Sequence, residues 1–433
     1  MPPVHAAAAK STRSAAEKQS RGPWALCEKF FTEQAMNGKL QVAGFKAGAV
    51  KAGIRGKDRL DVALIYSETP AAAAGVFTRS EVKAAPVLLD MEHLRGGRAQ
   101  AIIVNSGIAN ACTGKPGMAL ARGTAQLVAE KMAVAEELVM VASTGVIGQQ
   151  LELSIFSNCM TPLAASLRED GFAEVARAMM TTDTVPKTAL RQVELSGRTV
   201  TLLGLAKGSG MIMPNMATML SFIVTDAAVS APALQDMLRQ SVVSSFNAIT
   251  VDGDTSTNDT VLLLANGAAG NVEIDDPDAD DGRLFRQCLD EVCLDLALQI
   301  VKDGEGATKL ITILVKGAAG IKEADQAART IANSSLVKTA FFGEDANWGR
   351  IIAALGRSGV LFDAERVDIF FDGVQMVRDG LGLGPEQEKK ATAVLKQAAF
   401  AVVVDLKQGP AEAKVYTCDL SVEYIRINAD YRS

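Results

Sequence analysis

The sequence has very little histidine: His5 and His93 are the only two among 433 residues. His5 lies in a segment that resembles a tail, and His93 lies in the polar stretch 91–98, which is typical of a loop or a helix end. Catalytic machinery of the Ser-His-Asp or Cys-His type needs a well-placed imidazole. If this protein carries out acyl chemistry, a group other than histidine is therefore expected to act as the base.

The six cysteines do not form a C-x-x-C pair, so nothing indicates a zinc site or a dithiol redox motif. We expect reduced thiols, as in a cytosolic protein. Cys288 and Cys293 are predicted to be core residues, because they share an apolar helical stripe with other side chains. The other members of this stripe are Leu284, Leu289, Val292, Leu296 and Ile300.

Aromatic residues are also scarce, at 5%, and the net charge is −6. This balance lacks the basic footprint of a nucleic-acid-binding protein and favours a small-molecule ligand. No apolar run reaches the roughly 18 residues that a membrane-spanning helix needs. A hydrophobic content of 48% over 433 residues leaves room for a large core, in about two to three domains.

Residues 1–40 differ in composition from the rest of the chain. The first sixteen contain Lys10, Arg13 and two serines among alanines, and no acidic residue. This composition resembles an organellar transit peptide, although a disordered tail explains it equally well. We therefore expect a cytoplasmic protein or, if the segment is a transit peptide, a mitochondrial or plastid one.

From about Val42 the sequence alternates between apolar runs of strand length and helical patterns, which predicts sheets covered by helices. The predicted strands are 60–67, 101–105, 138–142, 200–205, 219–225, 311–315, 367–371 and 400–405. The predicted helices are 117–133, 231–246 with Ser230 as N-cap, 283–301 and 387–398.

The segment 207–220, KGSGMIMPNMATML, combines three features. Two glycines permit a close backbone approach, a Pro-Asn pair interrupts any helix, and the Ala217–Thr218 step then opens an apolar strand. Alone, this pattern is typical of a glycine-rich turn before a strand, and most such turns are structural.

This segment resembles the signature of the ornithine acetyltransferase family, whose members are also called glutamate N-acetyltransferases. They are made as a precursor that is cut between the Ala and Thr of an ATML motif. Further blocks resemble those of the family, and together they are too many for chance convergence. They are NSGIANACTG (105–114), STGVIG (143–148), TTDT (181–184), DGDTSTNDT (252–260), DGEGATK (303–309), NWGR (347–350) and INADY (427–431).

Cleavage of this kind accounts for the scarcity of histidine. Attack of the Thr218 hydroxyl on the Ala217 carbonyl would turn the peptide bond into an ester, and hydrolysis would leave Thr218 as a new N-terminus. The pKa of a free α-amine is about 7.7–8.0. The amine could therefore serve as general base for the hydroxyl of the same residue.

The resemblance also implies the other site residues. The Thr144 hydroxyl and the Gly145 N–H would stabilise the oxyanion, although without the family this segment is an ordinary strand-to-loop turn. Lys207 would pair with a substrate carboxylate, and Glu305 with the distal ammonium of ornithine. Taken singly, each could be a surface or capping residue. The full set of implied substrate contacts is Thr181, Lys207, Thr218, Glu305, Asn428 and Ser433.

Four positions depart from the family pattern. Met213 stands where many members have His or Ala, and Ile108 stands where Asn is common. Both could reshape the substrate pocket. Ser433 replaces the usual Thr, and Arg432 replaces a small polar residue. Neither Met213 nor Ile108 removes a nucleophile or an oxyanion donor.

The family implies an α/β fold: an αββα sandwich similar to that of N-terminal-nucleophile hydrolases but with different connectivity. A smaller C-terminal α/β region is expected from about residue 320. Cleavage would yield an α chain, 41–217, and a β chain, 218–433, with two of each in the assembly. The implied reaction is ping-pong acetyl transfer from N2-acetylornithine to glutamate through acetyl-Thr218. Neither a metal nor a bound cofactor is implied, and some members also accept acetyl-CoA as donor.

Two alternatives remain open at this stage. The segment 251–255, VDGDT, resembles the D-x-D-x-T loop of haloacid-dehalogenase-type phosphatases, in which one Asp is phosphorylated and the pair helps to bind magnesium. That loop usually lies near the chain start, and a polar loop bonded to backbone is the simpler interpretation. The other alternative is a non-catalytic descendant that binds amino acids or acyl compounds. Retention of Thr218, Thr144 and Lys207, together with Gly145 and Glu305, argues against it.

Removal of residues 1–40 is expected to leave self-cleavage and acetyl transfer intact, because every family block lies beyond this segment. Fragment masses and transferase assays of the truncated protein test this. A folded truncation that cleaves itself but has lost transfer would contradict it.

Overall fold

The computed structural model describes residues 39–56, 58–213 and 219–430. Residues 1–38 form a separate unit outside this range, so the interpretation of the N-terminal segment stays a prediction. Within the described ranges, every helix is too short or too polar to cross a membrane.

The larger sheet has eight strands in the order β4-β3-β2-β8-β7-β6-β5, and β1 pairs with β2 beside this path. The sixteen-residue β2 belongs to both halves of the sheet. Residues 62–66 pair with β3, and residues 72–77 pair with β8 after a break in register. The strands are β1 (Phe45–Val50), β2 (Val62–Phe77), β3 (Arg98–Ile108), β4 (Val139–Val146), β5 (Lys187–Leu195), β6 (Arg198–Lys207), β7 (Leu220–Thr225) and β8 (Thr260–Ala265).

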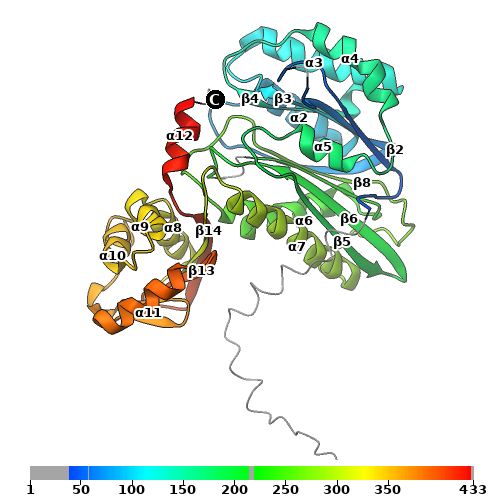
Figure 1. The fold of residues 1–433 in the computed structure, drawn as a ribbon. Helices are drawn as coiled ribbons and strands as arrows, with labels where there is room; N and C mark the ends of the chain where they lie inside the picture. Colours follow the sequence, from blue (N-terminus) through cyan, green and yellow to red (C-terminus); the bar gives the residue numbers. More distant parts are fainter. Residues whose placement is uncertain (1–38, 57, 214–218, 431–433) are drawn as a thin grey trace, which may run out of the picture. The chain divides into compact units, whose positions relative to one another are not determined.

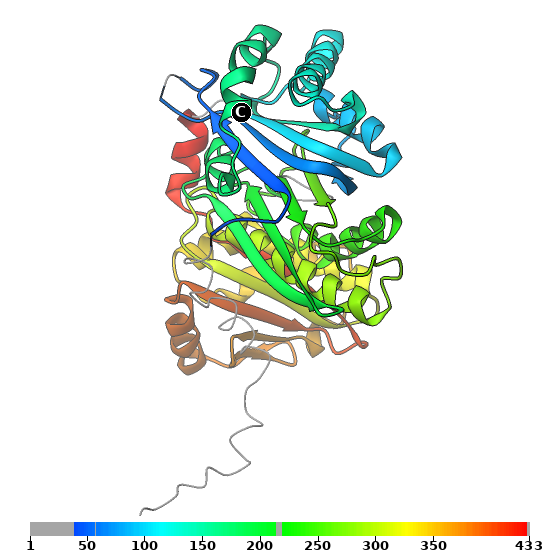
Figure 2. The same ribbon diagram turned by 90° about the vertical axis from the view of Figure 1, so that its right-hand side faces the viewer.

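The two halves of this sheet make the middle layers of a sandwich (Figures 1 and 2). Alternate side chains of β2–β4 pack outward against α2 (Ala85–His93), α3 (Gly114–Met132) and α4 (Leu153–Ala165). The outer face of β5–β8 packs against α6 (Ala231–Ser244) and α7 (Asp280–Lys302). The inner faces share a core with α5 (Phe172–Ala178). The predicted αββα sandwich is therefore confirmed.

The predicted smaller α/β region is also present, as a second sheet in the order β12-β11-β10-β13-β9-β14. It begins with β9 at Leu310 and has its own core under four helices. Its strands are β9 (Leu310–Ala318), β10 (Asp368–Phe371), β11 (Val374–Arg378), β12 (Leu381–Gly382), β13 (Ala399–Asp405) and β14 (Ala411–Cys418). The helices of this region are α8 (Ile321–Ala332), α9 (Ser335–Phe342), α10 (Trp348–Gly356) and α11 (Pro385–Leu395), and α12 (Val422–Asp430) follows β14.

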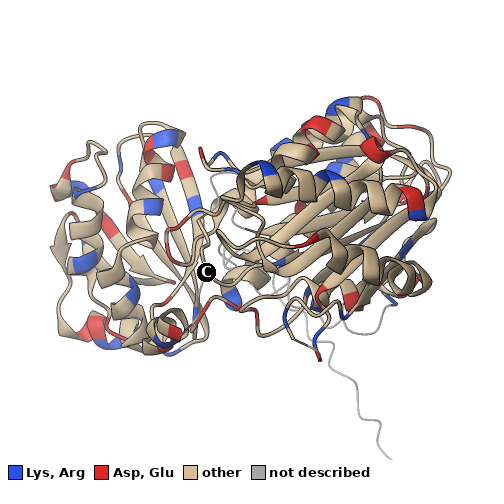
Figure 3. Ribbon diagram, turned by 90° about the horizontal axis from the view of Figure 1, so that it is seen from above, with Lys and Arg blue, Asp and Glu red and all other residues tan. Residues whose placement is uncertain are grey.

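The predicted strands correspond to β2, β3, β4, β6, β7, β9, β10 and β13, and the predicted helices to α3, α6, α7 and α11. Cys288 and Cys293 are buried as predicted, but Leu284 is 45% exposed and does not belong to the stripe. His93 ends α2, and its Nδ1 lies 2.8 Å from the Val139 carbonyl oxygen. Both signs of charge are interspersed over the helices and loops (Figure 3).

Candidate active site

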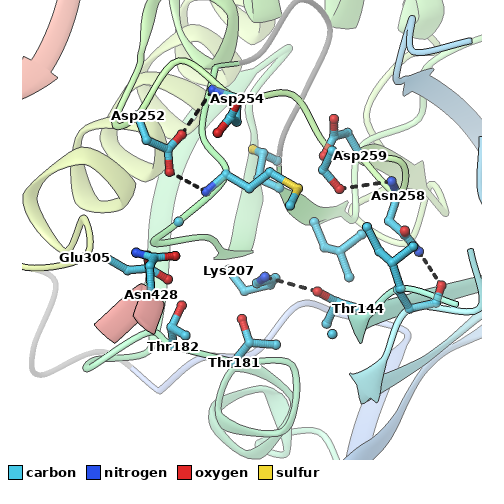
Figure 4. Close-up of a pocket in the computed structure, with 18 of the residues that line it drawn as sticks. Thr144, Thr181, Thr182, Lys207, Asp252, Asp254, Asn258, Asp259, Glu305 and Asn428 are labelled. Atoms are coloured by element: carbon cyan, nitrogen blue, oxygen red, sulfur yellow. Dashed lines mark hydrogen bonds between the residues drawn. The ribbon is translucent and has the colours of Figure 1, made fainter. Parts of the chain in front are cut away.

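A pocket opens where the ends of β4 and β6 and the start of β7 meet α12 (Figure 4). Its cavity measures about 160 Å³, which is room for on the order of ten water molecules. Such a space suits an amino-acid-sized ligand.

Six of the residues that the sequence predicted for the site line this pocket, although they come from five separate segments of the chain. They are Thr144, Gly145, Thr181, Lys207, Glu305 and Asn428. Ala217, Thr218 and Ser433 lie outside the described residues. Met219 and Leu220, which follow Thr218 in the sequence, also line the pocket. The structure thus brings these six predicted residues together, and the roles of all the predicted site residues stay predictions.

Thr144 and Gly145 lie near the C-terminal end of β4, where the backbone turns in a way that requires glycine at position 145. Gly145 has a φ of +128°, and a Cβ there would lie 2.2 Å from the carbonyl carbon of Gly107. These two glycines are paired across the parallel ladder of β3 and β4. The close approach lets the Thr144–Gly145 backbone reach the pocket wall.

Lys207 contacts this turn from the end of β6. Its side chain is buried, and Nζ donates to Thr144 Oγ1 over 3.1 Å (Figure 4). Because Thr144 Oγ1 accepts this bond, its own hydrogen can be donated elsewhere, as an oxyanion donor requires. Burial lowers the pKa of Lys207, and the Asp183 carboxylate opposes this effect.

A cluster of buried ion pairs holds the backbone next to two residues that line the pocket. The fully buried Lys187 Nζ lies 2.7 Å from Asp183 and 2.6 Å from Asp303. Asp183 also accepts from the backbone N–H groups of Gly208 and Thr181, at 2.7 and 2.9 Å. Burial acts to raise the pKa of Asp183, but the ammonium groups of Lys187 and Lys207 prevail and lower it to about 2. The ionised Asp183 therefore fixes the backbone beside two predicted substrate contacts.

Glu305 faces the pocket from the loop after α7. It is buried, and Asn428 Nδ2 of α12 donates to its Oε2 over 2.7 Å. A Cβ at position 210 would lie 2.3 Å from the Glu305 carboxyl carbon. Glycine at 210 thus leaves room for this carboxylate beside the 207–213 segment.

Sequence analysis missed several pocket residues, although most of them lie inside blocks that it quoted. The polar ones are Thr182, Asp252, Asp254, Ser256, Asn258, Asp259 and Tyr424. Asp259 is almost fully buried, and burial raises its pKa well above the usual range. All of them except Tyr424 lie in the TTDT and DGDTSTNDT blocks, and this was the available signal.

The D-x-D-x-T pattern is a loop that binds backbone. Both carboxylate oxygens of Asp252 are engaged, because they accept from the N–H groups of Met211 and Ile212 at 2.6 and 2.8 Å. For Asp252, this geometry matches the simpler interpretation of a polar loop bonded to backbone. Among the described residues, no group of His, Cys, Asp and Glu could hold a metal ion.

Two of the four departures from the family pattern, Met213 and Ile108, lie within the described residues. Met213 Sδ accepts from Asn333 Nδ2 over 3.2 Å, and its carbonyl oxygen accepts from Thr255 Oγ1 over 2.9 Å. Ile108 packs into the core under α3 and α4. Neither is among the described residues that line the pocket.

A buried, amino-acid-sized pocket at the end of an αββα sandwich defines an α/β enzyme that acts on a small metabolite. The model of the ArgJ family matches residues 46–433, and the chain belongs to this family. The arginine biosynthesis bifunctional protein ArgJ of Desulfotalea psychrophila is 55% identical over 396 residues, which cover 91% of this chain and 100% of that protein. The family that the sequence motifs predicted is confirmed.

Two solved structures are also similar. The ArgJ protein of Bacillus halodurans is 46% identical, with 49% of this chain and 100% of that chain covered and a TM-score of 0.48. The ornithine acetyltransferase of Mycobacterium tuberculosis, solved in complex with ornithine, is 40% identical, with 42% and 96% covered and a TM-score of 0.38.

Substitution Asp183→Asn is expected to destabilise the protein by about 3–5 kcal/mol, because it leaves the buried Lys187 without one of its partners. This corresponds to a melting temperature about 5 °C lower at pH 7. The pKa of Asp183 is lower in the folded state than in the unfolded state, so its contribution is complete above about pH 4 and is lost as the pH falls towards about 2. The difference between the variant and the parent should therefore narrow over this interval.

Asp236→Asn is the matched control, because Asp236 pairs with Arg239 while 62% exposed. Thermal unfolding should show a shift of about 1 °C or less for this variant. Equal shifts for the two variants would contradict a structural role of the cluster.

Proposed function

We propose that this chain transfers an acetyl group from N2-acetylornithine to glutamate, with Thr218 as the nucleophile. The chain is an acetyltransferase of arginine biosynthesis by its family. The relatives are called bifunctional, and we include acetyl-CoA as a second acetyl donor. The observation that carries the proposal is the convergence of six predicted residues, with complementary charges, on one pocket.

The charges of the pocket suit an amino acid with a second amine. The Glu305 carboxylate, oriented by Asn428, would attract the distal ammonium of ornithine. Lys207 uses one N–H for Thr144, and an ammonium has three donors, so it could also bind a substrate carboxylate. The ornithine complex of the M. tuberculosis ornithine acetyltransferase supports this choice of ligand.

Maturation would begin with attack of Thr218 Oγ on the carbonyl carbon of Ala217. The bond from this carbon to the Thr218 nitrogen breaks, the nitrogen takes the hydroxyl proton, and an ester forms. Water then hydrolyses the ester to the Ala217 carboxylate and the free Thr218 hydroxyl. The new α-amine can accept a proton near neutral pH, as a general base must.

Transfer would follow in two steps. In the first step, the α-amine takes the proton of Thr218 Oγ, and this oxygen attacks the acetyl carbonyl carbon. The proton then passes to the amine nitrogen of ornithine, which leaves. The amine of glutamate then attacks acetyl-Thr218, N-acetylglutamate leaves, and the proton released by its nitrogen returns to Thr218 Oγ. The Thr144 hydroxyl and the Gly145 N–H would stabilise each oxyanion.

The proposed fragments share one sheet. Strands β1–β6 belong to residues 41–217 and β7 and β8 to residues 218–433, and β6 pairs with β7 from Lys207↔Leu220 to Leu202↔Thr225. A ladder in a buried sheet does not separate without unfolding. We therefore include continued association of the fragments in the proposal, and an assembly with two of each.

The purified protein is expected to run as two fragments, 1–217 and 218–433, each about half of the 45.5 kDa chain unless the N-terminus is trimmed. Intact-mass spectrometry measures this directly. Active enzyme that contains only the full-length chain would disprove cleavage at Ala217–Thr218.

Thr218→Ala is expected to abolish both processing and transfer, whereas Thr218→Ser should retain some of both. Serine keeps the hydroxyl and the backbone nitrogen and loses only the methyl group that restrains χ1. Peptide mass spectrometry after incubation with acetylornithine should find the acetyl group on residue 218. Acetylation of Cys112 instead, with a fully active Thr218→Ala variant, would overturn the mechanism.

A further inference from the structure

Asn258 is a buried amide in the pocket wall (Figure 4). Its Nδ2 donates to the carbonyl oxygens of Ala109 and Ser143, over 2.6 and 2.8 Å. Its Oδ1 accepts from Thr257 Oγ1 over 2.6 Å. A primary amide has only two N–H donors. The donors of Asn258 are therefore committed to the two carbonyl groups, and none remains for a ligand.

The two carbonyl groups belong to the strands that lead to the Thr144–Gly145 turn. Ser143 lies in β4, and Ala109 directly follows β3. The parallel ladder between these strands is regular as far as Gly107↔Gly145, and its register then shifts. Asn258 thus links one carbonyl group of each strand close to the point where the regular ladder ends.

Because the peptide bond is planar, fixing the Ser143 carbonyl group also restrains the start of the Thr144–Gly145 turn. The Ser143 carbonyl and the Thr144 nitrogen belong to one planar peptide unit. Holding the carbonyl oxygen therefore holds the plane from which Thr144 and Gly145 continue. The Ser143 side chain is fixed separately, since its Oγ donates to Asn105 Oδ1 over 2.7 Å.

We propose that Asn258 is a positioning residue for acyl transfer, because its amide holds the 143–145 turn so that the Thr144 hydroxyl and the Gly145 N–H converge on one point of the pocket. This inference rests on the proposed function, in which these two groups stabilise the oxyanion. Because self-cleavage and acetyl transfer would use the same donors, loss of the amide slows both. A misplacement of about 1 Å can reduce a rate about 10²-fold.

The test compares Asn258→Leu with Asn271→Leu. Asn271 is a matched control: it is equally buried, its Nδ2 donates to the carbonyl oxygens of Ala228 and Val272 over 3.2 and 2.8 Å, and it lies outside the pocket lining. In matured enzyme, Asn258→Leu should lower kcat about 10²-fold and change KM for acetylornithine by less than about threefold. Asn271→Leu should lower the melting temperature and leave kcat unchanged.

Hydrogen exchange gives a second readout, which a change in global stability alone would not alter at one segment. The peptide that spans residues 143–148 should exchange faster in Asn258→Leu and at the parent rate in Asn271→Leu. If Asn258→Leu does not mature, Asn258→Ser, which keeps one donor, is assayed instead and should lose kcat about tenfold. A kcat within about threefold of the parent in the variant that matures, or equal effects of the two leucine variants, would overturn the proposal.

A double-mutant cycle with Thr144→Ala identifies the route of the effect. If Asn258 acts through the turn, the loss in kcat of the double variant is at least about tenfold smaller than the product of the two single losses. Multiplicative losses would overturn this route. If Thr144→Ala has no effect on kcat, the oxyanion role of the turn fails, and with it this part of the proposed function. If Thr144→Ala lowers kcat as expected but Asn258→Leu leaves kcat unchanged, only the inference about Asn258 is rejected.

Discussion

The antiparallel pairing of β6 with β7 is the constraint on which the site depends. It places Lys207, the last residue of β6, opposite Leu220, the first residue of β7. Residues 208–219 therefore connect two neighbouring points of the sheet. Asp252 binds this segment through two backbone amides on one side, and the N–H of Thr260 binds the Met219 carbonyl oxygen on the other. The proposed cleavage point is thus flanked by two fixed anchors.

The buried charges of the pocket hold one another in place. A single buried ion is expensive, but Lys187 lies between Asp183 and Asp303, and Asp183 also receives two backbone N–H bonds. Breaking one such pair is much more costly than breaking a surface pair. The cluster therefore holds the backbone next to the pocket residues Thr181 and Lys207 in place.

Most of the predicted strands had clear apolar runs, although β8, TVLLLA, was missed despite such a run. β1 and β5 were missed because their environment comes from tertiary structure. β1, FKAGAV, consists largely of residues with low strand propensity. β5 lies at the edge of the sheet, so six of its nine side chains are partly or fully exposed and its apolar pattern is weak. Pairing with β2 and β6 stabilises these two strands, because their own sequences favour a strand only weakly.

The prediction of the site was limited in the same way, because local sequence patterns do not reveal contacts between distant residues. Residues that belong to recognisable motifs, such as Lys207 and Glu305, were predicted, and the structure brings them to one pocket. Asn258 was missed because its partner Ser143 is 115 positions away, and no spacing reveals a side chain whose function is to bind distant backbone. The motif indicates which groups could react, but the packing decides how they are held.

Neither proposed fragment contains the whole site. Thr144, Thr181 and Lys207 precede residue 218, whereas Asn258, Glu305 and Asn428 follow it. The turn of the first part is tied by an amide of the second part. The proposed oxyanion donors would therefore be arranged in this way only after the whole sandwich has formed. The chemistry proposed for cleavage would therefore follow folding, and the cut would fall within a sheet that already holds both parts together.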